Sequence, residues 1–137
     1  MKSQLITNAK ENSGIADSNN CTICALAHSA SITYRQAFDI GKAAGRKTGK
    51  GFVTRRLIDQ AIQAGIKFQK VAFKTMSIAN FCKAYPRGRF VCRRSGHAFT
   101  VIDGVVTDHL HNRPLQRVTD AWEYRGSSQA NFANPWA

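Results

Sequence analysis

Three side chains in this sequence have the types and the order needed for thiol nucleophilic catalysis. Cys21 follows the polar stretch 17–20 and opens a run of small and apolar residues, which predicts a helix that begins at the thiol. A helix N-terminus and a nearby imidazolium both stabilise a thiolate and lower its pKa from about 8.5. A histidine oriented by a carboxylate can take and return the proton of such a thiol. His97 and Asp108 supply these two groups, so the three residues form the candidate catalytic set.

A predicted β-hairpin is the element that brings the histidine and the carboxylate together. Asp103-Gly104 lies between two β-branched runs and is a strong signal for a two-residue turn. Counting back from that turn, His97 and Asp108 point to the same face as diagonal neighbours, whereas His109 points to the other face. Asp103 lies roughly 20 Å from His97 along the strand, so the register selects Asp108. A three-residue loop would reverse this parity, so the prediction depends on the turn length.

The elements around this hairpin come in the order helices first, strands second. Apolar periodicity predicts helices over 21–29, 32–45, 54–65 and 77–85, and strands over 66–73, 89–94, 97–103, 105–110 and 117–124. Asn19 or Asn20 suits the cap of the first helix, and Thr33 with Gln36 has the spacing of a capping box before the second. This order predicts an α+β fold in which N-terminal helices pack on a C-terminal antiparallel sheet.

The chain length bounds the domain organisation. A sequence of 137 residues with 43% hydrophobic composition predicts a single domain over 1–137 with one core. Residues 1–18 are polar and predict an extended arm, with a short strand at Ser3–Ile6 as one option. Residues 126–137 predict an irregular tail. No internal repeat or second domain is indicated.

Charge and cysteine content narrow the setting and the partners. The net charge of +12, from 20 Lys and Arg against 8 Asp and Glu, favours an acidic partner, and nonspecific nucleic-acid binding is one option. This charge is spread along the chain, and no recognised nucleic-acid motif organises it. No apolar run approaches the roughly 18 residues of a membrane span, and the N-terminus lacks a secretory signal. We therefore expect no membrane partner, a cytoplasmic location and four free thiols, which are Cys21, Cys24, Cys82 and Cys92.

Three rival interpretations of the same residues are weaker. Cys21 and Cys24 form a C-x-x-C, but a redox pair should follow a strand, and the preceding polar segment does not predict one. A zinc site would need His109 and His111 as further ligands, which are closer together than a usual zinc-finger pair. The basic loop 46–51 resembles a phosphate-binding loop only loosely, because its spacing is one residue short and it lacks the required Ser or Thr. The sequence therefore predicts no metal and no cofactor.

The segments around the candidate catalytic residues resemble the papain-like cysteine peptidase superfamily in its small bacterial and phage-encoded form. The resemblance rests on "NNCTICALA", "GRFVCRRSGHAFTVIDG" and "VVTDHL", which cover residues 17–30 and 88–110. It implies Cys21 as the nucleophile, His97 as the base and acid, and Asp108 as the orienting carboxylate. It also implies a location in a bacterial host cell or an association with phage.

The oxyanion donor is the point where the sequence departs from this family pattern. Many members place a Gln six residues before the nucleophile, and Ile15 stands at that position here. Asn19 or Asn20 could substitute, together with the backbone N–H of Cys21. The catalytic hypothesis is a thiol hydrolase acting on peptide or isopeptide bonds of a protein or peptide substrate.

Two further expectations concern the surface and the alternative function. Arg93 and Arg94, close to the candidate histidine, could steer an acidic substrate or a polyanion. The missing Gln and the net charge motivate the alternative, which is a catalytically degenerate papain-like structural protein of phage or bacteria that binds nucleic acid or other proteins.

Overall fold

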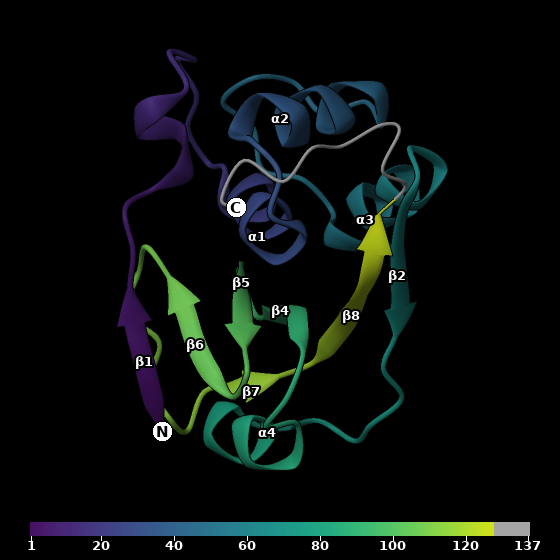
Figure 1. Cartoon of the computed structure of the whole chain (residues 1–137). Helices are drawn as coiled ribbons and strands as arrows, with labels where there is room; N and C mark the ends of the chain where they lie inside the picture. Colours follow the sequence, from purple (N-terminus) through teal and green to yellow (C-terminus); the bar gives the residue numbers. More distant parts are fainter. Residues whose placement is uncertain (128–137) are drawn as a thin grey trace.

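The computed structural model describes residues 1–127, and residues 128–137 lie outside the described part of the chain. The described residues combine helices and strands around one large sheet (Figure 1). The helices are α1 (Cys21–Ala30), α2 (Tyr34–Ala43), α3 (Thr54–Gln63), α4 (Ile78–Ala84) and the 3-10 helix η1 (Ala9–Asn12). The strands are β1 (Lys2–Leu5), β2 (Ile66–Lys70), β3 (Met76–Ser77), β4 (Arg89–Arg94), β5 (His97–Ile102), β6 (Val105–Asp108), β7 (Arg117–Val118) and β8 (Asp120–Ser127).

The main sheet has six strands in the order β1-β6-β5-β4-β8-β2, and a separate two-stranded sheet pairs β3 with β7. All pairs in the main sheet are antiparallel except β1 with β6, which is parallel. The α+β class is therefore confirmed, but the prediction of a purely antiparallel C-terminal sheet is wrong. The N-terminal arm supplies the parallel edge strand β1, so the short strand expected as one option at residues 3–6 is present, shifted by one residue.

The β5–β6 hairpin has the register that the sequence predicts. Ile102 pairs with Val105, so the connection is the two-residue turn at Asp103-Gly104. Both turn residues have positive φ, 49° and 75°, as a type I′ turn requires. A Cβ at Gly104 would also lie 3.2 Å from the carbonyl oxygen of Cys82, so both the positive φ and the close approach of Cys82 favour glycine here. The turn thereby fixes which side chains share a face of the hairpin.

Helices cover both faces of the main sheet. Phe90 packs in a core cluster with Phe81 of α4, whereas its neighbour Val91 packs against Ala25 of α1 and Ile58 of α3. Because adjacent strand residues point to opposite faces, α4 lies on one face and α1 with α3 on the other (Figure 1). The start of β5 lies beneath α1, which places the first residue of the strand near the helix.

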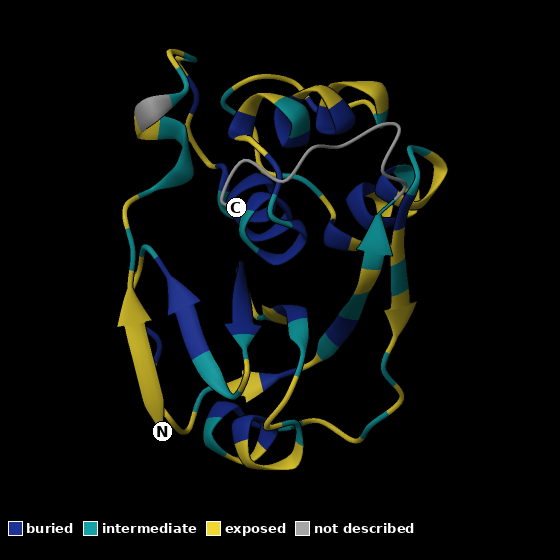
Figure 2. Cartoon of the chain, viewed as in Figure 1, coloured by how far each residue is buried: buried dark blue, intermediate teal, exposed yellow. Residues whose placement is uncertain are grey.

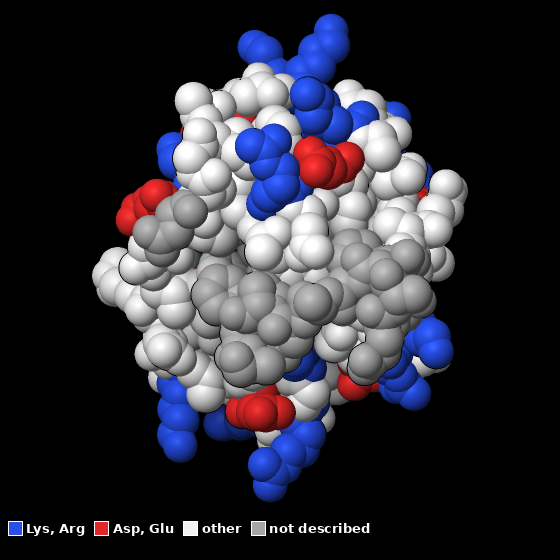
Figure 3. Space-filling model, turned by 45° about the horizontal axis from the view of Figure 1, so that its top comes forward, with Lys and Arg blue, Asp and Glu red and all other residues white. Residues whose placement is uncertain are grey.

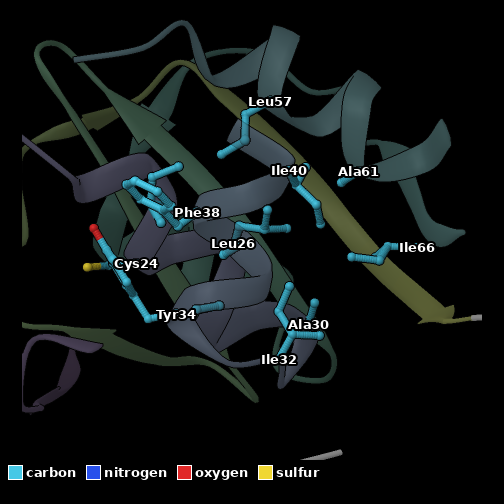
Figure 4. Close-up of a cluster of buried hydrophobic side chains, with 13 residues drawn as sticks. Cys24, Leu26, Ala30, Ile32, Tyr34, Phe38, Ile40, Leu57, Ala61 and Ile66 are labelled. Atoms are coloured by element: carbon cyan, nitrogen blue, oxygen red, sulfur yellow. The ribbon is translucent and has the colours of Figure 1, made fainter. Parts of the chain in front are cut away.

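The N-terminal helices enclose a core of their own around α1. α1 is buried along nearly its whole length, whereas α2 and α3 each turn one stripe inward (Figure 2). The cluster between them includes Leu26, Ile32, Phe38, Leu57 and Ile66 (Figure 4). Full burial of each such side chain contributes about 1.5–3 kcal/mol. This packing, together with the core on the sheet, holds α1 in place.

The predicted capping box is confirmed, and the predicted terminal segments are corrected in part. Thr33 Oγ1 accepts from the Gln36 N–H at 3.1 Å, and Gln36 Oε1 accepts from the Thr33 N–H at 2.9 Å. The expected irregular tail 126–137 is wrong for Gly126 and Ser127, which end β8, and its remainder lies outside the described residues. In the described part of the chain, no helix has the length and apolar character to cross a membrane.

Candidate active site

The Cys21 thiol lies at the first residue of α1, next to the start of β5. The side chain is partly exposed, and its sulfur interacts with the His97 ring and with the backbone N–H groups of Ala98 and Thr22. Helix α1 begins here because Asn20 is non-helical at φ −111° and its carbonyl accepts the first intrahelical bond from Cys24. The N-terminus of a buried helix thus presents the thiol to the first residue of the strand beside it.

The imidazole of His97 bridges this thiol and the buried carboxylate of Asp108. His97 Nε2 lies 2.6 Å from Asp108 Oδ2, and the two side chains are 6% and 4% exposed. Because Nε2 is engaged by the carboxylate, Nδ1 is the ring nitrogen left for Cys21. The hairpin register brings the two residues together as the sequence predicts, whereas Asp103 lies in the turn and bonds to the Gly88 N–H.

The electrostatics of the pair favour a thiolate facing an imidazolium. Burial by itself raises the pKa of Cys21, but the hydrogen bonds from His97, Ala98 and Thr22 outweigh it and hold that pKa below its usual value. Burial likewise opposes the charged ring, but the hydrogen bonds to Asp108 and Cys21 raise the pKa of His97 to about 9. There is accordingly a pH window, ending near 9, in which both groups are charged.

Several donors converge on the Asp108 carboxylate and fix its orientation. Oδ1 accepts from the backbone N–H of His109 at 2.8 Å, and Oδ2 accepts from Asn112 Nδ2 at 2.7 Å. Burial acts to raise the pKa of Asp108, but the bond from His97 and these further partners hold it below the usual range. Asn112 is itself held, because Arg94 Nε donates to its Oδ1 at 2.8 Å. A continuous chain of contacts therefore runs from the Arg94 guanidinium to the thiol.

A buried ion pair anchors the segment that precedes Cys21. Arg46 donates through both terminal nitrogens to the two oxygens of Asp17, each at 3.0 Å, and both side chains are almost fully buried. The Tyr34 hydroxyl and the Gly49 N–H also donate to this carboxylate. Loss of one partner from a buried pair of this kind costs about 3–5 kcal/mol. The loop before α1 is thereby fixed to the loop after α2.

An open cleft of about 560 Å³ gives access to the candidate nucleophile. Both Cys21 and His97 line it, so a substrate in the cleft would meet the sulfur and the ring together. Phe52, Val53 and Trp122 add apolar surface to its walls. Asp108 does not line the cleft, because it lies behind the ring and is 4% exposed. The arrangement can hold a carbonyl group against a thiolate, with a proton donor beside it.

The structure does not bring the predicted oxyanion donors Asn19 and Asn20 to this cleft. Asn20 is 6% exposed and its amide nitrogen donates to Asn8 and to the Tyr34 hydroxyl. The Asn19 amide donates to the Gly49 carbonyl at 3.0 Å. The expectation is therefore corrected: the two amides close the loop before α1. The backbone N–H of Cys21 stays as a candidate donor, since the first N–H groups of a helix have no intrahelical acceptor.

The two arginines predicted to steer a substrate separate into different roles. Arg93 is exposed and lines the cleft. Arg94 is partly buried, is not among the described cleft residues and bonds to Asn112 instead. The expectation for Arg94 is therefore corrected. Adjacent strand residues point to opposite faces, so the two side chains part at the strand.

The residues that suggested a redox pair, a zinc site or a phosphate-binding loop lie as follows in the structure. Cys24 is buried, its thiol donates to Asn8 Oδ1 at 3.1 Å, and burial raises its pKa to about 12. No strand is assigned between η1 and α1. Within residues 1–127, no group of three or more His, Cys, Asp or Glu side chains is arranged to hold a metal. In the loop 46–51, Arg46 turns inward to Asp17. All four cysteines fall in the described part and are free.

Sequence reasoning missed Asn112, Asp17 and Arg46. The two members of the ion pair are 29 residues apart, and nothing local links them. A signal for Asn112 was available, because it lies four residues after Asp108, but its loop has no periodicity to place it.

Comparisons with family models, with curated proteins and with solved structures found no match to this chain.

Proposed function

We propose that this protein is a thiol hydrolase of papain-like type that cleaves peptide or isopeptide bonds through Cys21, His97 and Asp108. One observation carries the proposal. The buried Asp108 carboxylate lies 2.6 Å from the His97 ring, that ring interacts with the Cys21 thiol at a helix N-terminus, and thiol and ring open into one cleft. Thiol nucleophiles need a base and a group that orients that base, and this arrangement supplies both.

The proposed reaction is acyl transfer in two steps. The Cys21 thiolate attacks the carbonyl carbon, a C–S bond forms, and the carbonyl oxygen takes the negative charge. As the C–N bond breaks, His97 gives its Nδ1 proton to the leaving amine, which leaves a thioester on Cys21. The ring then takes a proton from water, the hydroxide attacks the thioester, and the released thiolate faces an imidazolium again. Asp108 holds the ring throughout and stabilises its charged form.

Alkylation with iodoacetamide tests whether the thiol is activated. Near neutral pH, Cys21 should react much faster than Cys24, Cys82 and Cys92, which are buried with raised pKa values. His97→Ala should slow the reaction at Cys21. Equal and slow labelling of all four thiols in the folded protein would contradict the proposal.

Turnover is tested on a library of peptides derived from a bacterial lysate. New termini that appear with the wild-type protein and not with Cys21→Ala support hydrolysis. A thioester adduct on Cys21 that hydroxylamine releases would support the acyl intermediate. The same new termini in both samples would show that the chain does not cleave through this thiol.

The second candidate is a degenerate papain-like scaffold that binds nucleic acid, and the net charge of +12 favours it. On the face shown in Figure 3, however, Lys and Arg side chains lie in separate groups with Asp and Glu among them. Salt-sensitive DNA binding that survives Cys21→Ala, without activated labelling of that thiol, would favour this candidate over the hydrolase.

A further inference from the structure

The cleft beside Cys21 carries more positive than negative charge. Among its described lining residues outside the thiol and imidazole, Arg55, Lys70 and Arg93 are cationic and Asp120 is the only carboxylate. The three cations are exposed and come from separate elements, α3, β2 and β4. The charge of the cleft is thus assembled by the fold from distant parts of the sequence.

The Asp120 carboxylate is already occupied by partners on the same wall. Lys70 Nζ lies 2.7 Å from Oδ1, and Arg93 Nη1 lies 3.5 Å from Oδ2. The Thr119 hydroxyl also donates to Oδ2 at 3.1 Å. A cationic substrate group would have to displace these partners and approach Arg55 as well. The wall therefore disfavours a basic substrate side chain.

Arg55 is the cation of the cleft that has no partner in the described part of the chain. Its guanidinium makes no hydrogen bond or ion pair with residues 1–127. It occupies the first turn of α3, whose N-cap Val53 makes no side-chain cap bond. A second polar group of the cleft is also unpaired, since Thr22 is 4% exposed and its hydroxyl has no partner among these residues. Of these two groups, the exposed Arg55 guanidinium is the one that can donate to an anion in the cleft.

We propose that this cleft selects substrates with a carboxylate side chain, Asp or Glu, next to the scissile bond, with Arg55 as the main specificity-determining residue. The proposal rests on the proposed thiol hydrolase function. Arg55 contacts the carboxylate directly, since its planar guanidinium matches carboxylate geometry. Arg93 and Lys70, which also line the cleft, add attraction. Phe52 and Val53 contact the apolar part of the peptide.

The structure favours a peptide over a nucleic acid as the anionic occupant. Nucleic-acid grooves combine a basic track with aromatic faces on which bases stack. The described aromatic residues of the cleft, apart from His97, are Phe52 and Trp122. The Arg56 guanidinium carbon lies 5.1 Å from the Phe52 ring centroid, and Trp122 is only 5% exposed with Lys70 Nζ 4.6 Å from its ring centroid. One face of each ring is therefore already covered by a basic side chain.

Two alkylating agents that differ in charge test the proposal without a known substrate. Iodoacetate is anionic and iodoacetamide is neutral, and with both the thiolate displaces iodide to form a C–S bond. The measurement is the ratio of the iodoacetate rate to the iodoacetamide rate at Cys21, relative to the same ratio for glutathione, at low ionic strength. We expect this relative ratio to exceed one and to fall as salt is added, because exposed charges are screened.

Charge variants give the expected direction and size. Arg55→Gln should lower the ratio by about two- to fivefold, since one exposed charge pair contributes up to about 1 kcal/mol. Asp120→Asn should change it in the opposite direction. Arg35→Gln is the matched control, because Arg35 is exposed on α2 and does not line the cleft.

A peptide arm identifies the occupant. Peptide aldehydes that are identical except for Glu, Gln or Lys beside the aldehyde should inhibit iodoacetamide labelling in the order Glu, Gln, Lys, and Arg55→Gln should remove the preference for Glu. A ratio equal to that of glutathione, no change in Arg55→Gln, or protection by an oligonucleotide but not by the Glu aldehyde would overturn the proposal. If iodoacetamide itself reacts at Cys21 no faster than at glutathione, the thiol hydrolase function fails first.

Discussion

Replacing Asp108 by Asn should shift the ionisation of the site while the hairpin stays folded. The pKa of His97 is raised from 6.5 to about 9 against the effect of burial, mainly by the hydrogen bonds to Asp108 and Cys21. That rise corresponds to about 3 kcal/mol of preference for the imidazolium. An amide is similar in size to the carboxylate but carries no charge, so much of this preference should disappear. With less imidazolium, the thiolate forms at a higher pH.

The rate of Cys21 alkylation by iodoacetamide, measured from pH 5 to 10, reports this change. For Asp108→Asn we expect the rise of the profile to move to higher pH and the rate at pH 7 to fall by about tenfold or more, the equivalent of about 1.4 kcal/mol. Asp103→Asn is the matched control, since that carboxylate lies in the turn of the same hairpin and bonds to the Gly88 N–H. Circular dichroism checks the fold of both variants. A folded Asp108→Asn protein whose profile superimposes on the wild type would refute the reasoning.

Three further substitutions test the groups that support the site. Asn112→Ala removes one hydrogen-bond donor from the Asp108 carboxylate. It should slow the alkylation of Cys21 in the same assay, but by less than Asp108→Asn does. An effect equal to or greater than that of Asp108→Asn would contradict the supporting role assigned to Asn112. Asp17→Asn should lower the free energy of unfolding by about 3–5 kcal/mol because it leaves Arg46 buried without a charge partner. Burial acts to raise the pKa of Asp17, but its partners, mainly Arg46, lower that pKa from 3.8. The stabilisation of the folded state by the Asp17 carboxylate is therefore present above pH 3.8 and is lost as the pH falls further. Urea titrations at pH 3 and 7 should show a smaller difference in the free energy of unfolding between variant and wild type at the lower pH. Gly104→Ala should lower the free energy of unfolding by about 1–2 kcal/mol because of its positive φ, and the contact with the Cys82 carbonyl oxygen should lower it further. Gly51→Ala is the control: its added Cβ meets no atom within 4 Å, so it should change thermal stability little.

The parts of the fold that follow local rules could be predicted from the sequence. The Asp103-Gly104 turn sets the hairpin register, and this register predicts the contact between His97 and Asp108 that the structure contains. The Thr33 capping box is likewise a short-range signal, and it occurs as predicted. These features depend on a few neighbouring residues, so the sequence contains the information that defines them.

Features that depend on distant partners could not be predicted. A short strand near residues 3–6 was one option from the sequence, but its parallel pairing with β6, about a hundred residues later, has no local signal because β1 is exposed at every position. Asn20 looked available to a substrate, but its amide is used by Asn8 and Tyr34. Its polar side chain suited an oxyanion donor, and only the packing of η1 and α2 around it shows otherwise.

The same limit applies to the charges around the cleft. Arg93 and Arg94 are adjacent in the sequence, yet one lines the cleft and the other bonds to Asn112. Nothing in the sequence links Arg55 to Cys21, because only the fold brings the first turn of α3 to the cleft that Cys21 lines. The alternation of side chains along β4 separates Arg93 from Arg94, and tertiary packing brings Arg55 to the cleft.

The central claim is that a thiolate and an imidazolium coexist at Cys21 and His97. Thiolate absorbance near 240 nm, measured against pH with the Cys21→Ala protein subtracted, reads the ionisation of this sulfur directly. We expect a transition below the ordinary thiol pKa that moves upward in His97→Ala. A transition at or above the value of an ordinary thiol, unchanged in His97→Ala, would contradict the account.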